Sequence, residues 1–384
     1  MNLKAGAAVL DITPHSPCHL AGYEDRDHPH EGVHDPLSVR ALYLTNGSEE
    51  LVLISADIIW FHEDIANPIH NLIKEQLGLA PERVMLCGTH THSAPVPSRP
   101  GANSEYLHFL TSQVLAAVSV AKTRIEPVSL SIARGSSQVG VNRREQKPGG
   151  EVVLGYNEDG PIDREIILLS LAGADGRVQA EVCSFANHGV VLGPRNYLIS
   201  GDWCGMAAAA VESERKEVFL FMNGGSANVN PRLRSGPQER FKPAEDLAAE
   251  FVHDLVAARE TLVPPTGDDT LSGRFSTLEL PLKVKAIEDG QGRTQRVRIH
   301  GIRIGPACIV GFPGEVFSET SIAVKETRAP DTVIVNSYTS GGSAGYVPVR
   351  EAYDTGGYEV RVSPYSEGAE ERLRQGFIDL IRNL

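Results

Sequence analysis

The sequence predicts an α/β fold in which mixed β-sheets are flanked by helices. Short apolar runs typical of strands alternate with stretches that have the apolar spacing of helices. The pair Asn46-Gly47 between two apolar runs is typical of a β-hairpin, so some neighbouring strands should be antiparallel. The chain has no internal repeat and no linker long enough to divide it. We therefore expect one domain spanning residues 1–384.

The individual elements follow from apolar runs and from the residues that end helices. The segment 63–78 places Ile65, Ile69 and Ile73 on one helical face and ends at Gly78, a common helix-terminating residue. Strands are predicted at residues 5–12, 38–45, 51–56, 84–87, 127–134, 164–172, 178–186, 217–222, 270–285, 295–304, 307–311 and 332–336. Helices are predicted at residues 63–78, 104–123, 203–215, 242–261, 316–327 and 367–383. Loops are predicted at residues 88–95, 145–162, 223–232 and 337–362.

Composition excludes several classes of function. The formal net charge of −13 argues against nucleic acid or an anionic membrane as the main partner, because both attract basic surfaces. The five cysteines form no C-x-x-C pair, as expected for reduced, buried thiols. The N-terminus lacks the apolar length of a signal peptide, and no stretch approaches the roughly 20 apolar residues of a membrane span. We therefore expect a cytoplasmic protein without a transmembrane segment that acts on a small molecule or lipid.

Polar side chains follow several of the predicted strands. His90 and His92 lie two residues apart after strand 84–87, and an extended backbone would turn both imidazoles to one side. His188 and Glu315 each follow another apolar run. The loop 337–362 adds the tyrosines Tyr346, Tyr353 and Tyr358. Because α/β sheets bind ligands where strands end, these side chains are candidates for one site.

The residue types favour a catalytic zinc site. Zinc binds imidazole and carboxylate groups and keeps one position open for a water, whose pKa it lowers. The H-E-x-x-H signature is absent, which excludes a helix-borne zinc protease site. Each residue also has a structural alternative: His188 can be a hydrogen-bonded core histidine, and Glu315 can stabilise a helix dipole. We interpret Asp57 as a strand-end carboxylate and Asp202 as a helix cap.

Taken together, the motifs resemble the neutral ceramidases, the neutral/alkaline non-lysosomal ceramidase family of zinc amidases. The resemblance rests on short segments that keep the family's order along nearly the whole chain: 11-DIT-13, 21-AGY-23, 32-GVHDPLSVRA-41, 89-THTHSAP-95, 142-NR-143, His188, 199-ISGD-202, 313-PGE-315, Tyr346-Val347 and 358-YE-359. It implies the fold of that family's catalytic domain, in a short form without the C-terminal Ig-like domain of longer members.

The resemblance implies a zinc-dependent hydrolase that cleaves an amide (N-acyl) bond with a metal-activated water. The zinc ligands that it implies are His90, His188, Glu315 and Tyr346. His92 is the implied general acid/base, and Tyr358 and Arg143 are the implied donors to the oxyanion. The implied substrate is ceramide-like, although a smaller or more polar amide fits equally well. A homo-oligomer is compatible with the sequence.

One position departs from the family, and two other functions stay open. The family has a serine that contacts the scissile amide where this chain has Gly224, with Ser226 two positions further on; backbone N–H groups could fill the role of that serine. The segment 341-GGSAG-345 fits the G-x-S-x-G motif of a serine hydrolase with Ser343 as nucleophile, but the expected strand and helix do not flank it. The other alternative is a non-catalytic homologue that binds a metal or ligand.

Overall fold

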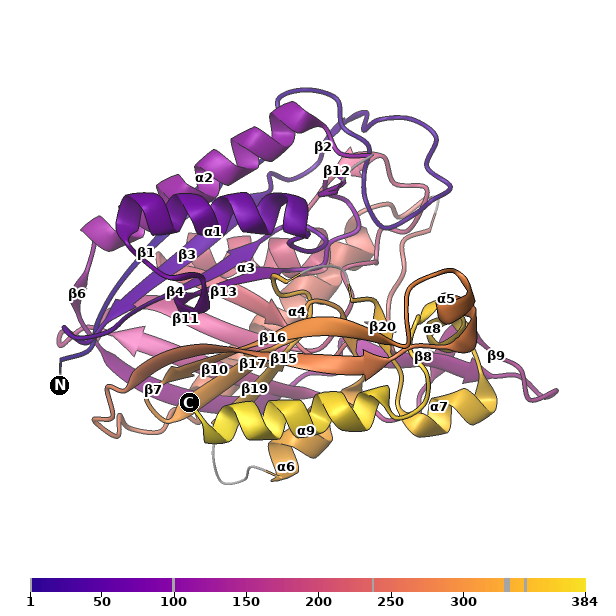
Figure 1. Cartoon of the computed structure of the whole chain (residues 1–384). Helices are drawn as coiled ribbons and strands as arrows, with labels where there is room; N and C mark the ends of the chain where they lie inside the picture. The colour runs from indigo at the N-terminus through magenta and orange to yellow at the C-terminus, as the bar shows by residue number, and fades with distance from the viewer. Residues whose placement is uncertain (1, 99–100, 237, 328–331, 342–343) are drawn as a thin grey trace.

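Three large mixed sheets form the centre of the computed structural model, which describes residues 2–98, 101–236, 238–327, 332–341 and 344–384 (Figure 1). The first sheet contains, in spatial order, β5 (Val84–Gly88), β4 (Glu50–Ala56), β3 (Ser38–Thr45), β1 (Lys4–Asp11) and β6 (Glu126–Pro127). The second contains β13 (Val218–Asn223), β11 (Val178–Phe185), β10 (Glu165–Ala172) and β7 (Ser129–Ser136). The third contains β15 (Leu271–Pro281), β16 (Thr294–Ile304), β17 (Ala307–Gly311) and β19 (Thr332–Asn336).

Small sheets and short helices complete the described part of the chain. One small sheet pairs β12 (Leu198–Ile199) with β2 (Gly32–Val33), and another pairs β18 (Glu315–Val316) with β20 (Tyr346–Val347). A third has β8 (Gly140–Gln146) in the middle, between β14 (Val229–Pro231) and β9 (Val152–Asn157). The short helices are the 3-10 turn η1 (Pro81–Arg83), α5 (Val284–Glu288), α7 (Arg350–Thr355) and α8 (Tyr358–Val362).

A pair of longer helices covers the outer face of each large sheet. The pairs are α1 (Glu63–Leu77) with α2 (Ser104–Thr123), α3 (Asp202–Arg215) with α4 (Lys242–Arg259), and α6 (Ser318–Thr327) with α9 (Ala369–Arg382). In Figure 1, α1 and α2 lie above the sheets and α6 and α9 lie below them. The alternation of side chains along each strand explains this arrangement. In β4, Val52 and Ile54 pack toward α1 and α2, whereas Leu51 and Leu53 enter a core shared by all three sheets.

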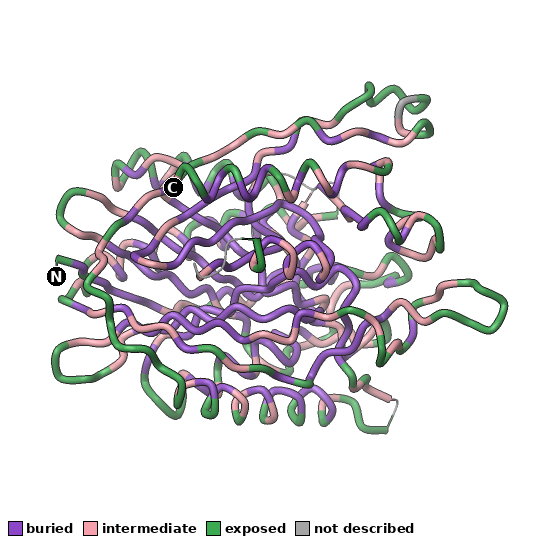
Figure 2. Tube along the Cα trace, turned by 90° about the horizontal axis from the view of Figure 1, so that it is seen from below, coloured by how far each residue is buried: buried purple, intermediate pink, exposed green. Residues whose placement is uncertain are grey.

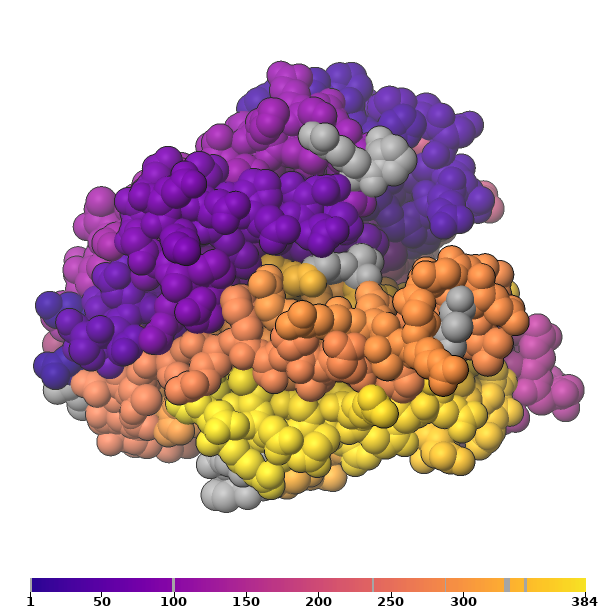
Figure 3. Space-filling model, viewed as in Figure 1, coloured from indigo at the N-terminus to yellow at the C-terminus, as the bar shows by residue number. Residues whose placement is uncertain are grey.

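Because helices cover one face and other sheets cover the opposite face, the central strands are apolar on both sides. Figure 2 shows this pattern, with buried positions along the central strands and exposed positions on the outer loops and turns. The space-filling view shows an indentation between the N-terminal region, coloured indigo, and the orange region around α5 (Figure 3). No helix of the described residues is at once long enough and apolar enough to cross a membrane.

One parallel strand pair in each of the three large sheets determines where the polar loops meet. The pairs are β4 with β5, β11 with β13, and β17 with β19. The loops after these strands touch one another: Gly88 N–H donates to the carbonyl of Tyr338, and the amide of Asn223 donates to the carbonyl of Thr89. The carboxyl ends of the three pairs therefore face one common site.

The predicted α/β class with mixed sheets is confirmed, and most predicted elements lie within a few residues of the observed ones. Three predicted loops nevertheless contain short elements. Residues 145–162 include β9, residues 223–232 include β14, and residues 337–362 include β20, α7 and α8. β14, β20, α7 and α8 are short elements that tertiary contacts stabilise, and the six-residue β9 forms by pairing with β8.

Two acidic residues test the interpretation of strand and helix ends. Asp57 is a strand-end carboxylate as expected, and it forms a buried ion pair with Arg40 at 2.9 Å. The helix-cap interpretation of Asp202 is wrong. Asp202 is the first residue of α3, and its carboxylate accepts hydrogen bonds from the backbone N–H groups of Val191 and Leu192. The N-cap position is occupied by Gly201, whereas the Asp202 carboxylate fastens the loop after His188 and also accepts from the N–H of Trp203.

Candidate metal centre

His90 is held in an uncommon backbone conformation at the end of β5. Its φ is +70°, and its N–H donates to the carbonyl of Ile58. The ring Nδ1 lies 2.9 Å from the carbonyl of Ile59, so Nδ1 carries the proton and Nε2 is left as an acceptor. Gly88 permits this turn, because a Cβ there would lie 2.9 Å from the Ile58 carbonyl oxygen. The Nε2 atom therefore faces the common site.

His92 is the immediate neighbour of His90. The two Nε2 atoms are 3.2 Å apart, and because His90 Nε2 is an acceptor, His92 Nε2 is the donor of this contact. The segment carrying Gly22 lies against the ring of His92, where any Cβ would come within 2.1 Å of Nδ1. Burial, the neighbouring His188 and the cation Arg26 all lower the pKa of His92 well below 6.5. A neutral imidazole is thus favoured at this position.

His188 approaches from the second sheet. Its ring centre is 4.7 Å from that of His90, and its Nδ1 lies 2.8 Å from the carbonyl of Ser226 and 2.9 Å from that of Val229. Nδ1 is again the protonated atom, and Nε2 points into the site. Burial, followed by the charge of Arg143, lowers the pKa of His188 well below 6.5.

Glu315, in β18, and Tyr346, in β20, approach the site from the side of the third large sheet. They are register partners in the parallel pair of β18 and β20. Glu315 Oε2 lies 3.3 Å from His188 Nε2, and the residue is 9% exposed. Burial raises the pKa of Glu315, against the opposing effect of His90 and Arg143.

Arg143 joins several of these groups. Its guanidinium donates to Glu359 at 2.7 Å, to the Tyr346 hydroxyl at 3.2 Å and to His188 Nε2 at 3.2 Å. Tyr358 stands beside them, with its ring centre 5.7 Å from that of Tyr346 and also 5.7 Å from the Arg143 guanidinium. The structure therefore brings all seven predicted site residues into one neighbourhood.

The donor set fits a divalent metal ion. The candidate ligand atoms of His90, His92 and His188 all lie within 4.8 Å of one another. His90 and His188 both direct Nε2 into the site, because each ring is oriented by a carbonyl bonded to its other nitrogen, an arrangement common among metal-binding histidines. These Nε2 atoms accept hydrogen bonds from His92 and Arg143, respectively, and a metal ion would take the place of these donors. Glu315 adds an anionic oxygen beside them. Nitrogen and carboxylate donors of this kind suit zinc.

The likeness to known proteins agrees with this geometry. The profile of the family described as neutral/alkaline non-lysosomal ceramidase, N-terminal, matches residues 3–233, more than half of the chain. The chain belongs to this family. The matched part contains His90, His92, Arg143 and His188, whereas Glu315, Tyr346 and Tyr358 lie beyond it.

Individual ceramidases are similar to this chain over part of their length. Neutral ceramidase B of Dictyostelium discoideum is 24% identical over 266 residues, which cover 61% of this chain and 36% of that protein. The neutral ceramidase of Mycobacterium tuberculosis is 23% identical over 232 residues, which cover 54% of this chain and 35% of that protein. The match thus spans about a third of the length of these curated relatives.

The fold is shared with a solved ceramidase structure. The neutral ceramidase from Pseudomonas aeruginosa superposes with a TM-score of 0.81 at 20% identity, covering 100% of this chain and 75% of that chain. A structure titled as a ceramidase complexed with C2 gives the same TM-score at 19% identity, covering 100% of this chain and 76% of that chain.

The site also contains residues that the sequence did not single out. Tyr338 stacks on His90 with ring centres 3.6 Å apart, and Glu359 holds both Arg143 and Arg144. Arg26 is 7% exposed and donates to the carbonyl of His92 at 2.6 Å. A signal existed for Glu359, which follows Tyr358 in the family-like pair 358-YE-359. No local pattern marked Tyr338 or Arg26.

Position 224 differs from the expectation. The N–H of Gly224 donates to the carbonyl of Phe185 at 3.0 Å, so it is not free to replace the family's serine. Ser226 has its hydroxyl 2.9 Å from that of Tyr338, at the edge of the site. Ser343, the nucleophile of the alternative serine hydrolase, lies outside the described residues.

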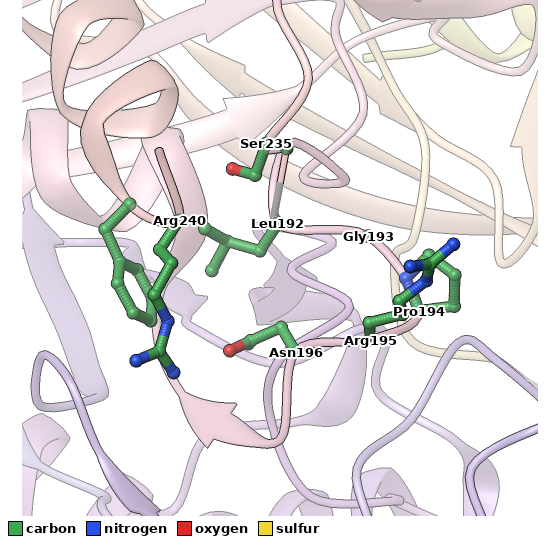
Figure 4. Close-up of a pocket in the computed structure, with 9 residues that line it drawn as sticks. Leu192, Gly193, Pro194, Arg195, Asn196, Ser235 and Arg240 are labelled. Atoms are coloured by element: carbon green, nitrogen blue, oxygen red, sulfur yellow. The ribbon is translucent and has the colours of Figure 1, made fainter. Parts of the chain in front are cut away.

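Two of the hollows formed by described residues differ in their relation to this cluster. One, of about 380 Å³, is bordered by residues 192–196 and by Arg240 and Phe241, and contains none of the seven residues. In Figure 4, Arg240 and Pro194 lie on opposite sides of it. The other, of about 450 Å³, is lined by Val152, Val153, Leu154, Tyr358 and Arg361 among others. Only the second hollow adjoins the candidate centre, through Tyr358.

Proposed function

We propose that this chain is a zinc-dependent hydrolase that cleaves the amide bond of an N-acylated substrate with water. The observation that carries the proposal is the contact between His188 Nε2 and Glu315 Oε2 at 3.3 Å, with His90 at 4.7 Å from His188 between ring centres. Membership of the ceramidase family supports it. In this proposal His90, His188, Glu315 and Tyr346 hold the zinc ion.

When bound, zinc supplies a water molecule of lowered pKa and a positive charge beside the scissile carbonyl. His92 holds and moves the proton, taking it from the water at Nε2 and passing it to the leaving nitrogen. The lowered pKa of His92 favours a neutral ring, and Nε2 becomes the basic nitrogen when the ring proton moves to Nδ1 and the contact with His90 is broken. Neutralising the leaving amine in this way makes the bond cleavage favourable.

Arg143 and Tyr358 act on the oxygen of the scissile carbonyl. The guanidinium of Arg143 is fixed by Glu359, so it is oriented before substrate arrives. The Tyr358 phenol keeps its proton, because burial raises its pKa, and it is a neutral donor to the developing oxyanion. Preoriented donors of this kind stabilise the transition state more than the substrate.

The hollow at Tyr358 bears on the substrate. Val152, Val153 and Leu154 provide an apolar wall, and Arg361 provides a cation on the same hollow. Such a lining suits an amide with a modest apolar group and a polar end, so we propose that ceramide is one candidate among smaller N-acyl amides. Four buried cysteines, Cys18, Cys87, Cys183 and Cys204, form no disulfide, which supports a reducing, cytoplasmic location.

Metal analysis combined with an amide panel tests the proposal. Purified protein is expected to contain one zinc per chain, to lose amidase activity with a chelator and to regain it with zinc. The panel pairs ceramides with N-acyl amides of decreasing acyl length, and the released amine is measured by mass spectrometry. Inhibition by a fluorophosphonate but not by a chelator would instead support the serine hydrolase, and zinc binding without any turnover would support the non-catalytic homologue.

A further inference from the structure

Tyr338 and His90 form a buried pair of parallel rings. Their planes are inclined by 11° with centres 3.6 Å apart, and each residue is 1% exposed. Both have left-handed backbone conformations, with φ of +59° for Tyr338 and +70° for His90. Bulky residues adopt this conformation rarely and at an energetic cost, and such strain concentrates at functional sites.

The backbone of Tyr338 is fixed between two of the loops that carry candidate ligands. Its N–H donates to the carbonyl of Gly314, the residue directly before Glu315. Its own carbonyl accepts from the N–H of Gly88, two residues before His90. The left-handed turn therefore places the Tyr338 ring between the His90 loop and the Glu315 loop.

The Tyr338 hydroxyl connects the remaining groups. It lies 3.4 Å from Glu315 Oε2 and 2.9 Å from the hydroxyl of Ser226. Because the carboxylate only accepts, the Tyr338 O–H points to Glu315 and the Ser226 O–H points to Tyr338. The carbonyl of the same Ser226 accepts from His188 Nδ1 at 2.8 Å. One side chain thus contacts His90 by stacking, Glu315 by its hydroxyl, and His188 through Ser226.

We propose that Tyr338 is a positioning residue of the metal centre, which sets the relative orientation of His90, Glu315 and His188. This inference rests on the proposed zinc site. The ring fixes the plane of the His90 imidazole, and the hydroxyl fixes the rotamer of the Glu315 carboxylate. Loss of such supporting contacts around metal ligands typically weakens metal affinity by about 10- to 100-fold.

Three variants separate the ring from the hydroxyl. Tyr338→Phe keeps the stack and removes the hydrogen bond to Glu315, whereas Tyr338→Leu removes both. Ser226→Ala keeps the carbonyl for His188 and removes the partner of the Tyr338 hydroxyl. Tyr353→Phe is the matched control, because it also removes a tyrosine hydroxyl bond, the 2.9 Å contact to the carbonyl of Tyr365.

The measurements are zinc affinity by chelator competition, the absorption spectrum of the cobalt-substituted protein, and thermal unfolding of the metal-free protein. We expect Tyr338→Phe to weaken zinc binding about tenfold and to shift the cobalt bands, and Tyr338→Leu to weaken binding further. Ser226→Ala should have a smaller effect of the same sign. Its combination with Tyr338→Phe should be no worse than Tyr338→Phe alone, because both changes act on one hydrogen-bond chain.

The possible results distinguish a failure of the Tyr338 role from a failure of the proposed zinc site. Unchanged zinc affinity and cobalt spectra in both Tyr338→Phe and Ser226→Ala would overturn the role of Tyr338 and leave the zinc site intact. An equal loss in Tyr353→Phe would show that the effect is not specific to the centre, which also overturns that role. If the unaltered chain binds no zinc, the proposed function fails and this inference fails with it.

Discussion

His188 Nε2 and Glu315 Oε2 face each other across 3.3 Å as two hydrogen-bond acceptors. His188 donates from Nδ1 to backbone carbonyls, so its Nε2 has no proton to offer, and the lowered pKa of the ring opposes a second protonation. The contact is therefore not an ordinary ion pair. Two acceptors at this distance repel unless a cation lies beside them. The Arg143 guanidinium, 3.2 Å from His188 Nε2, supplies one positive charge, and a metal ion bound between the two acceptors would supply a second.

Replacing Glu315 with glutamine should raise the unfolding temperature of the metal-free protein and weaken zinc binding. The amide N–H of Glu315→Gln can donate to His188 Nε2, so the metal-free variant should unfold at a higher temperature than the unaltered protein. Zinc affinity should fall about 100-fold, because an anionic ligand is lost. Thermal unfolding with and without zinc measures both effects.

The control for this prediction is Glu319→Gln, which neutralises another partly buried glutamate, one that accepts from Asn228 instead of facing the histidines. Its zinc affinity should stay within about twofold of the unaltered protein. Should Glu315→Gln destabilise the metal-free protein and leave zinc binding unchanged, Glu315 would be a structural residue.

His92 should be needed for turnover but not for metal binding. Its Nε2 atom lies 3.2 Å from that of His90, as close as a second zinc ligand would lie. The geometry is therefore compatible with two roles for His92, proton carrier and zinc ligand. If His92 carries a proton, His92→Ala should lower kcat by about 10²- to 10⁴-fold and leave zinc affinity unchanged. As a ligand, its loss would weaken zinc binding. Chelator competition and steady-state kinetics on the same preparation distinguish the two, with the exposed His253→Ala as control.

The sequence located the ligand candidates but not the network around them. His90, His188 and Glu315 each follow an apolar strand, and strand ends are visible in the pattern of residues. Their convergence depends on which strands form parallel pairs in three different sheets, and pairings between distant segments leave no local trace. The family resemblance supplied this missing information.

Tyr338, in contrast to the ligand candidates, could not be identified from the sequence. It follows β19 in the polar run Tyr338-Thr339-Ser340, where a helix or strand pattern is absent and a tyrosine carries no ligand signature. Its position depends on a left-handed φ of +59°, and a tyrosine in the sequence gives no indication of that conformation. Likewise α8 is only five residues long, and Glu359 within it is held by Arg143 and Arg144 rather than by local propensity.

The buried ion pair of Arg40 and Asp57 should be essential for stability. Both side chains are 1% exposed, and Arg40 also contacts Glu212 at 2.8 Å. Removing the cation in Arg40→Met leaves the buried Asp57 carboxylate without a countercharge, with only the N–H of Ser38 as a donor, which should lower the free energy of unfolding by about 3–5 kcal/mol. Urea unfolding measures the loss.

The comparison for Arg40 is Arg177→Met. Arg177 pairs with Glu126 at 3.5 Å, but the two side chains are 69% and 59% exposed. Such surface pairs contribute at most about 1 kcal/mol. Adding Asp57→Asn to Arg40→Met should recover part of the loss, because the unpaired charge is then gone. Equal losses in Arg40→Met and Arg177→Met would contradict the argument from burial.

Two buried histidines outside the candidate centre should make the fold sensitive to acid. Burial lowers the pKa of His70 to about 4 and that of His300 to about 3. Each has Nε2 bonded to a backbone carbonyl, that of Val84 for His70 and that of Glu82 for His300. Below pH 6.5 these two histidines are therefore protonated in the unfolded chain but stay neutral in the folded chain.

This difference lowers the free energy of unfolding as the pH falls from 6.5 toward the folded pKa. For His70 the loss is complete near pH 4, and at pH 5 it should reach about 2 kcal/mol. His70→Gln keeps a donor for the carbonyl of Val84 but cannot titrate. Urea unfolding at pH 7 and pH 5 should show a fall that is smaller by about that amount in His70→Gln than in the unaltered protein. The exposed His253→Gln should leave the fall unchanged, and an identical fall in all three proteins would mean that His70 is protonated in the folded state at pH 5.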